Sequence, residues 1–133
     1  MSTLLRSTVI QGKPSEGTLS NAVFITKHLK GKTIFLSMND GEMSNGILYT
    51  HTLSEGTKAI IITDVFFPHH TEAIIKMFTP EKITFFKPGR KDETIVKMPA
   101  LIFCTSSPKE LIPFNQLPGG PEKQVGYLDC SFD

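Results

Sequence analysis

The chain has 133 residues, which is enough for one domain, because two domains would each be too small to bury a good core. Its hydrophobic fraction of 39% is near the globular norm and argues against intrinsic disorder. The net charge of +1 excludes a global basic field, so any nucleic-acid contact has to be a local patch.

Strands and helices alternate along the first half of the chain. Apolar and β-branched residues predict strands at 4–11 and 32–38, separated by an amphipathic helix at 18–29. The stretch 42–56 is compatible with either a helix or a strand. The continuous apolar run at 58–63 predicts a strand that is buried on both faces, as in a parallel sheet.

The second half of the chain adds a helix, a hairpin and further strands. The helix is predicted at 68–78, and the two hairpin strands are predicted at 83–86 and 94–96. Another fully apolar strand follows at 100–104, and a last strand is expected at 125–130. This alternation predicts an α/β fold with a central, mostly parallel sheet, flanking helices and a basic β-hairpin before the penultimate core strand.

The sequence carries no pattern for export or membrane insertion. Residues 1–11 lack the apolar stretch and the cleavage site of a signal peptide. No window approaches the roughly 18 apolar residues of a membrane span. The two cysteines, Cys104 and Cys130, leave a disulfide open but do not make a secreted scaffold. We therefore expect a cytoplasmic or nuclear protein that is not secreted and has no membrane partner.

Ligands of such sheets bind beyond the carboxyl ends of the strands. In this chain that rule selects four places, which are the loop 12–17, the turn at Asn39 and Asp40, Asp64, and residues 105–107. We expect the functional residues of the chain to lie at these four places.

The first of these places has the composition of a phosphate-binding loop. A predicted strand runs into Gly12 and Lys13, and Gly17 and Thr18 lead into a predicted helix. This arrangement resembles the loop of P-loop ATPases, in which backbone N–H groups and a helix N-terminus hold phosphate. The resemblance implies a nucleotide-binding role for these four residues.

Two later strands follow the order of the same family. Residues 58–64 are similar to the apolar strand that ends in a magnesium-holding aspartate, here Asp64. Residues 100–107 resemble the strand that ends in a polar sensor residue, here Ser106 or Ser107. The resemblance therefore adds Asp64 and Ser106 to the candidate nucleotide site.

The hairpin between them narrows the resemblance to superfamily 3 helicases, in particular the helicase domain of replication-initiator proteins of small single-stranded DNA viruses. In that family, basic hairpin residues grip DNA in the channel of a ring. The positions here are Lys87, Arg90 and Lys91, with Lys97 nearby.

We expect a single domain at 1–133, with a P-loop-like core at roughly 4–113 and a Pro/Gly-rich tail at 113–133. The resemblance implies single-stranded nucleic acid, a homo-oligomer or another protein as partners.

The residues that ATP hydrolysis requires in this family are replaced. Thr18 follows Gly17 where the loop lysine is expected, and that lysine normally reaches the β- and γ-phosphates. Val65 stands where many members have a second acid, and a serine replaces the sensor asparagine. No arginine follows the sensor strand to serve as an arginine finger. We expect no catalytic residue and no firmly bound cofactor, Mg-ATP being the one ligand left open.

Other reactive residues have simpler interpretations. His69 and His70 diverge by about 100° on a helix and lack a partner cluster, so no metal site is expected. Cys104 lies in an apolar strand and is expected to be a buried small hydrophobic residue rather than a nucleophile.

Three functions fit these observations. We expect a catalytically degenerate helicase-like domain, viral or virus-derived, that acts as a nucleic-acid-binding or assembly module. The first alternative is a divergent active NTPase in which Lys13 or a partner subunit supplies the missing charge. The second is a viral structural or protein-interaction protein with no nucleotide site.

Overall fold

The computed structural model describes residues 7–13, 17–27, 31–41, 57–78, 83–85, 93–95, 99–117 and 125–130. These residues contain a five-stranded sheet whose strands all run parallel, in the order β2-β3-β6-β1-β7. The strands are β1 (Ser7–Gln11), β2 (Lys32–Ser37), β3 (Thr57–Val65), β6 (Ala100–Thr105) and β7 (Gly126–Asp129). The prediction of an α/β fold with a mostly parallel sheet is confirmed.

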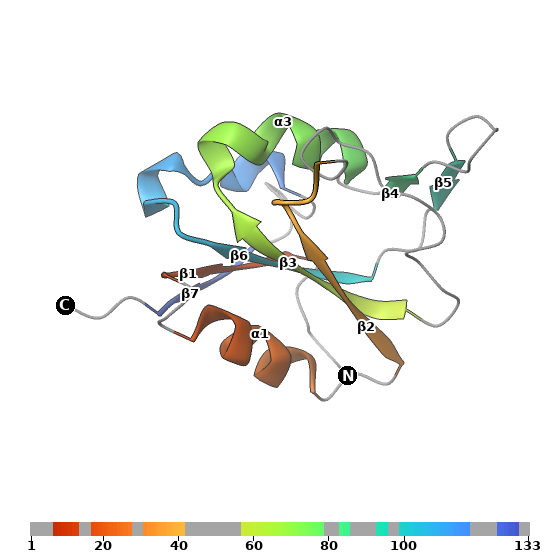
Figure 1. The fold of residues 1–133 in the computed structure, drawn as a ribbon, viewed down its shortest axis with the longest axis horizontal. Helices are drawn as coiled ribbons and strands as arrows, with labels where there is room; N and C mark the ends of the chain where they lie inside the picture. Colours follow the sequence, from red (N-terminus) through yellow and green to blue (C-terminus); the bar gives the residue numbers. More distant parts are fainter. Residues whose placement is uncertain are drawn as a thin grey trace.

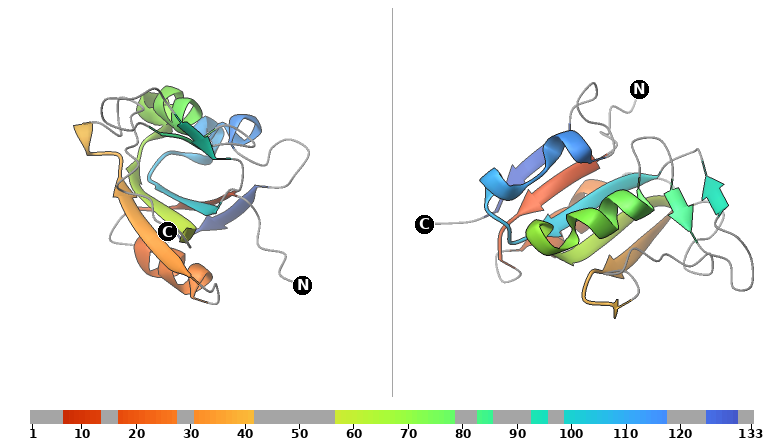
Figure 2. Two further views of the ribbon diagram at one scale, coloured as in Figure 1. Left: turned by 90° about the vertical axis from the view of Figure 1, so that its right-hand side faces the viewer. Right: turned by 90° about the horizontal axis from the view of Figure 1, so that it is seen from above.

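Helices cover both faces of this sheet (Figure 1). Helix α1 (Thr18–Thr26) lies on one face, and α3 (Phe67–Met77) lies on the other with two short 3-10 helices, η3 (Lys109–Leu111) and η4 (Phe114–Gln116). The end-on and top views place the two long helices on opposite sides of the strands (Figure 2). The chain is therefore a three-layer structure, helix on sheet on helix.

The direction of each crossover explains this placement. The chain passes from β1 through α1 to β2, at one edge of the sheet, and from β3 through α3 back toward β6. Right-handed crossovers that run in opposite directions place their helices on opposite faces. The loops that leave β1 and β3 therefore diverge, and β6 lies between them.

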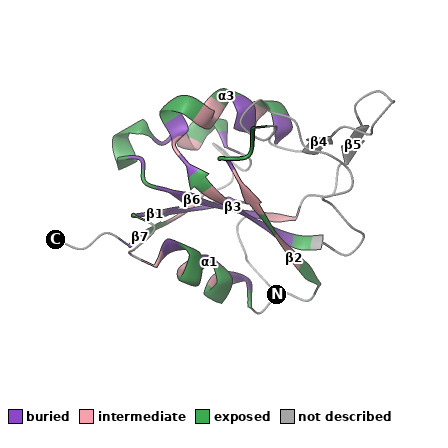
Figure 3. Cartoon of the chain, viewed as in Figure 1, coloured by how far each residue is buried: buried purple, intermediate pink, exposed green. Residues whose placement is uncertain are grey.

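Strands β3 and β6 are apolar on both faces because both faces are covered (Figure 3). Ile60 and Ile62 belong to the core on the α3 side, and Ile61 belongs to the core on the α1 side. In β6 the same alternation places Phe103 toward α3 and Ile102 toward α1. All five side chains are fully buried.

Aromatic rings fill the core beneath α3. The ring centroid of Phe103 lies 6.1 Å from that of Phe67 and 6.4 Å from that of Phe78, both tilted or edge-on. Ile74 and Met77 complete the apolar side of α3 against the same cluster. Such aromatic pairs add about 0.5–1.5 kcal/mol each beyond the burial of their area.

The core beneath α1 is smaller. Ala22 packs with Ile61 and Ile102 there, together with both cysteines. The opposite side of the helix leaves Val23 and Phe24 exposed, the latter by 65%. One face of the molecule therefore presents apolar side chains outside the core.

The observed elements differ from the predicted ones at their ends. Strand β3 continues two residues further than predicted, through Val65, and α3 begins at Phe67 with Pro68 in its first turn. The ambiguous stretch 42–56 and the predicted strand start at 4–6 lie outside the described residues. The short helices η3 and η4 were not predicted. None of the described helices is long and apolar enough to cross a membrane.

Replacing Phe103 by alanine tests the aromatic core. The side chain is fully buried between two other rings, so Phe103→Ala is expected to lower the free energy of unfolding by about 3–5 kcal/mol. Phe35 on the edge strand is 56% exposed, and Phe35→Ala is expected to cost less than about 1 kcal/mol. Urea unfolding followed by circular dichroism measures both variants, and equal losses would contradict the arrangement.

Candidate functional site

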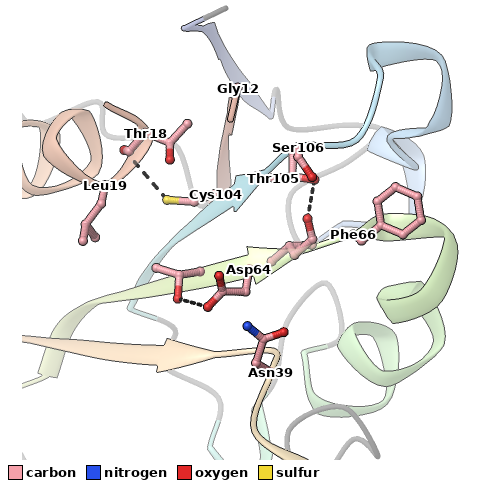
Figure 4. Close-up of a pocket in the computed structure, with 11 residues that line it drawn as sticks. Gly12, Thr18, Leu19, Asn39, Asp64, Phe66, Cys104, Thr105 and Ser106 are labelled. Carbon is pink, nitrogen blue, oxygen red and sulfur yellow. Dashed lines mark hydrogen bonds between the residues drawn. The ribbon is translucent and has the colours of Figure 1, made fainter. Parts of the chain in front are cut away.

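A cavity of about 480 Å³ lies at the carboxyl edge of the sheet, over the end of β6 (Figure 4). All four places selected from the sequence contribute to its lining. Gly12 and Thr18 come from the loop and the start of α1, Asn39 follows β2, Asp64 is in β3, and Ser106 follows β6. The divergence of the loops after β1 and β3 opens this space, as expected at a topological switch point.

Glycine is required where the loop enters α1. Gly17 is the N-cap of the helix and has a φ of 83°, in the left-handed region that glycine adopts without steric cost. The side chain of Asn21 donates a hydrogen bond of 2.9 Å to the Gly17 carbonyl, which fixes the first turn. Thr18 and Leu19 of this first turn line the cavity.

Thr18 stands where the loop lysine is missing. Its residue surface is only 5% exposed, and its hydroxyl, which points toward the cavity, has no hydrogen-bond partner among the described residues (Figure 4). Lys13, the residue expected to compensate, is exposed and is not part of the cavity lining. Residues 14–16 of the loop lie outside the described part of the chain.

A bulge in β3 turns Asp64 toward the cavity. The register between β3 and β6 shifts between Ile62 and Val65, and Asp64 within that shift has a φ of 60°. It is the one non-glycine residue with positive φ among those described. Bulges next to functional sites commonly redirect a side chain in this way.

Two hydroxyl groups hold the Asp64 carboxylate. Ser37, the last residue of β2, donates a hydrogen bond of 2.6 Å to Oδ2, and the Thr63 hydroxyl lies 3.1 Å from the same oxygen. The backbone N–H of Asn39 in turn donates to the Ser37 hydroxyl at 3.1 Å. The other oxygen, Oδ1, points into the cavity (Figure 4). Sequence reasoning missed Ser37, although its place at the end of β2, paired with Thr63, was a usable signal.

The two serines after β6, Ser106 and Ser107, differ in their exposure. Ser106 is exposed and lines the cavity, whereas Ser107 is completely buried. The Ser107 hydroxyl accepts a 2.9 Å hydrogen bond from the backbone N–H of Phe67 and lies 3.0 Å from the Thr105 hydroxyl. Ser107 therefore satisfies a free N–H at the start of α3, and Ser106 is the residue that a ligand can reach.

The cavity combines a single charge with an apolar wall. Asp64 is the one charged side chain among its described lining residues. Leu19 and Phe66 contribute apolar surface, together with Cys104 at the base. This described surface offers no cation to phosphate groups.

Cys104 is an inert part of that base. It is 5% exposed, as predicted, and its thiol lies 3.9 Å from the Thr18 carbonyl. Burial, followed by the proximity of Cys130 and Asp64, raises the pKa of Cys104 to about 12. The thiolate is therefore negligible at neutral pH.

The histidine pair begins α3 beside the cavity. His69 is exposed, and the Nδ1 atom of His70 accepts a hydrogen bond of 2.9 Å from the backbone N–H of Phe66. This bond requires neutral Nδ1, and burial together with the nearby His69 lowers the pKa of His70. No cluster of three or more His, Cys, Asp or Glu residues that could hold a metal ion occurs in the described parts of the chain.

A second sheet consists of two short strands. Strands β4 (Ile83–Phe85) and β5 (Glu93–Ile95) pair in the antiparallel direction. The basic positions predicted to contact nucleic acid lie outside the described residues; they are Lys87, Arg90, Lys91 and Lys97. Their contact with nucleic acid stays a prediction.

No protein-family model, curated protein or solved structure matches this chain. The candidate site therefore has to be interpreted from its own geometry and chemistry.

The cysteines are expected to resist alkylation in the folded protein. With a pKa near 12, the Cys104 thiol should react with iodoacetamide at pH 8 at least about 10³-fold more slowly than a free thiol. Mass spectrometry after timed labelling measures the rate, and guanidinium-unfolded protein, in which both cysteines react, is the control. Rapid labelling of Cys104 in the native protein would contradict the described burial.

His70 is expected to make stability depend on pH. Its folded pKa lies below the ordinary value of 6.5, so the unfolded chain binds the proton more readily. The contribution of His70 is therefore complete above about pH 6.5 and is lost as pH falls below it. Urea unfolding between pH 7.5 and 5 should show a smaller pH dependence in His70→Gln. His69→Gln is the matched control and should retain most of the pH dependence, because burial contributes more than His69 to the lowered pKa of His70.

Proposed function

We propose that this chain is a P-loop-like module of the superfamily 3 helicase type that does not hydrolyse ATP and acts in nucleic-acid binding or assembly. A viral or virus-derived origin is part of the proposal. One observation carries it. Four of the six residues that the resemblance assigned to nucleotide binding, Gly12, Thr18, Asp64 and Ser106, line one cavity at the carboxyl edge of a parallel sheet.

The placement of β6 supports the relationship to P-loop ATPases. The loop after β1 and the acid of β3 face each other across the end of β6, whose own exit supplies Ser106. A polar sensor residue has to stand between the phosphates and the acid in such enzymes.

The chemistry of the lining argues against hydrolysis. Phosphoryl transfer depends on cations that neutralise charge as it develops on the transferred group, and an arginine finger alone contributes roughly 10³–10⁵ in rate. The described lining contains a carboxylate, hydroxyls, an amide and apolar groups. A module of this kind would retain the architecture of the site without its catalytic charge.

Exposed apolar side chains support the assembly part of the proposal. Leu19 and Val23 on α1 are 46% and 45% exposed, and Phe35 on the neighbouring edge strand is 56% exposed. Exposed apolar groups of this size are common in surfaces that bind other proteins. The basic residues around the hairpin supply the local charge that the nucleic-acid part of the proposal needs.

A divergent active NTPase is the second candidate. The orientation of Asp64 favours it, because Ser37 and Thr63 fix one carboxylate oxygen and leave the other directed into the cavity. This is the arrangement that a water-coordinated Mg²⁺ could use.

Two measurements on the purified chain test the proposal. Release of phosphate from ATP with Mg²⁺ should stay at background, and it should be unchanged in Lys13→Ala. Fluorescence anisotropy should show binding of a single-stranded oligonucleotide that weakens as salt rises, with a smaller salt dependence after Lys87, Arg90 and Lys91 are replaced by glutamine.

Phosphate release that disappears in Asp64→Asn would favour the active enzyme. If the chain elutes as an oligomer, does not hydrolyse ATP and does not bind the oligonucleotide, the result would favour a structural or protein-interaction protein. A chain that is monomeric and binds no oligonucleotide would refute the proposal.

A further inference from the structure

The charge of the cavity disfavours polyphosphate as its ligand. The carboxylate of Asp64 is exposed to the cavity, and no Lys, Arg or His side chain is among the described lining residues. A phosphate group that entered would meet a like charge, whereas a neutral hydrogen-bond donor would meet a strong acceptor.

The two oxygens of Asp64 have different roles. Oδ2 is already occupied by the hydroxyls of Ser37 and Thr63, at 2.6 Å and 3.1 Å. Oδ1 is directed into the cavity (Figure 4), and none of the described residues forms a hydrogen bond with it. An acid presented in this way at the end of a parallel strand is the group that binds ribose hydroxyls in other doubly wound folds.

Neutral polar groups surround this acceptor. Thr18 is 5% exposed as a residue, and its hydroxyl, which has no hydrogen-bond partner among the described residues, is directed at the same space from the start of α1. A hydroxyl can both donate and accept, so it can pair with another hydroxyl. The exposed Ser106 hydroxyl and the Asn39 amide stand at the rim.

The remaining lining requires an apolar part in the ligand. Leu19 lines the cavity from the start of α1, and Phe66 lines it from the N-cap of α3, on the other side of the sheet. Cys104 closes the base between them. The cavity, about 480 Å³, falls in the range of roughly 300–1,000 Å³ typical of small-molecule sites.

From these features we infer that the cavity binds a neutral small molecule that carries a vicinal diol on a partly apolar body, as a nucleoside does. The diol donates to Asp64 Oδ1, Thr18 hydrogen-bonds the same part of the ligand, and the apolar body lies against Leu19 and Phe66. This inference rests on the proposed function, in that the cavity has retained its shape and lost its preference for triphosphate.

Isothermal titration with four ligands tests this specificity. Adenosine should bind, 2′,3′-dideoxyadenosine should bind about tenfold more weakly because it lacks the diol, and ATP without metal should also bind at least about tenfold more weakly. Methyl β-ribofuranoside carries the diol without a base and tests the apolar part of the inference. Weaker binding than adenosine is expected, and binding equal to that of adenosine would overturn the contact of an apolar body with Leu19 and Phe66.

Two variants connect binding to the named residues. Asp64→Asn removes the charge and keeps a residue that tolerates positive φ, and Thr18→Val removes the hydroxyl at nearly constant size. Each should weaken adenosine binding about tenfold. Glu72→Gln, which removes an exposed acid of α3, is the matched control and should bind like the original chain.

The outcomes separate this inference from the proposed function. ATP that binds more tightly than adenosine, adenosine that does not bind at millimolar concentration, or equal binding of the dideoxy compound would each overturn the diol site. Unchanged affinity in Asp64→Asn and Thr18→Val would place the ligand elsewhere and overturn it too. Hydrolysis of ATP would instead refute the proposed function, and it is measured independently by phosphate release.

Discussion

The position of β6 between β1 and β3 is the constraint on which the rest of the structure depends. Its backbone pairs in parallel with a strand on each edge, and helices cover both of its faces. The side chains on both faces of β6 therefore have to be apolar. Leu101 and Phe103 face α3, and Ile102 and Cys104 face α1. Because β6 lies between β1 and β3, the connection from β1 to β2 and the connection from β3 to β6 run in opposite directions and cross opposite faces of the sheet. The cavity lies between the starts of these two connections.

Much of this fold was predictable from local sequence pattern. The uninterrupted apolar runs within β3 and β6 indicate strands covered on both faces, and helical spacing marks α1 and α3. The order of the strands was not predictable in this way, because it depends on which strands pair across long separations. The single-domain organisation stays a prediction.

The candidate site was predictable in part, for a related reason. The carboxyl ends of parallel strands meet at one edge, so Gly12, Asp64 and Ser106 could be grouped without knowing the sheet order. The bulge could not be foreseen, because it is a mismatch of register between β3 and β6 rather than a property of either strand. The choice between Ser106 and Ser107 also required the path of the chain, since alternate residues point in opposite directions.

The strained backbone of Asp64 bears on whether the cavity is functional or incidental. A non-glycine residue in the left-handed region costs of order 1–3 kcal/mol and persists only where its surroundings hold it. Here β2 supplies that support through Ser37, yet the conformation leaves the carboxylate exposed instead of burying apolar area. A glycine would adopt the same backbone without strain, but it would present no acid. The stability of the sheet therefore does not explain why an acid stands in the bulge, whereas the proposed ligand of Oδ1, which has no partner among the described residues, would explain it.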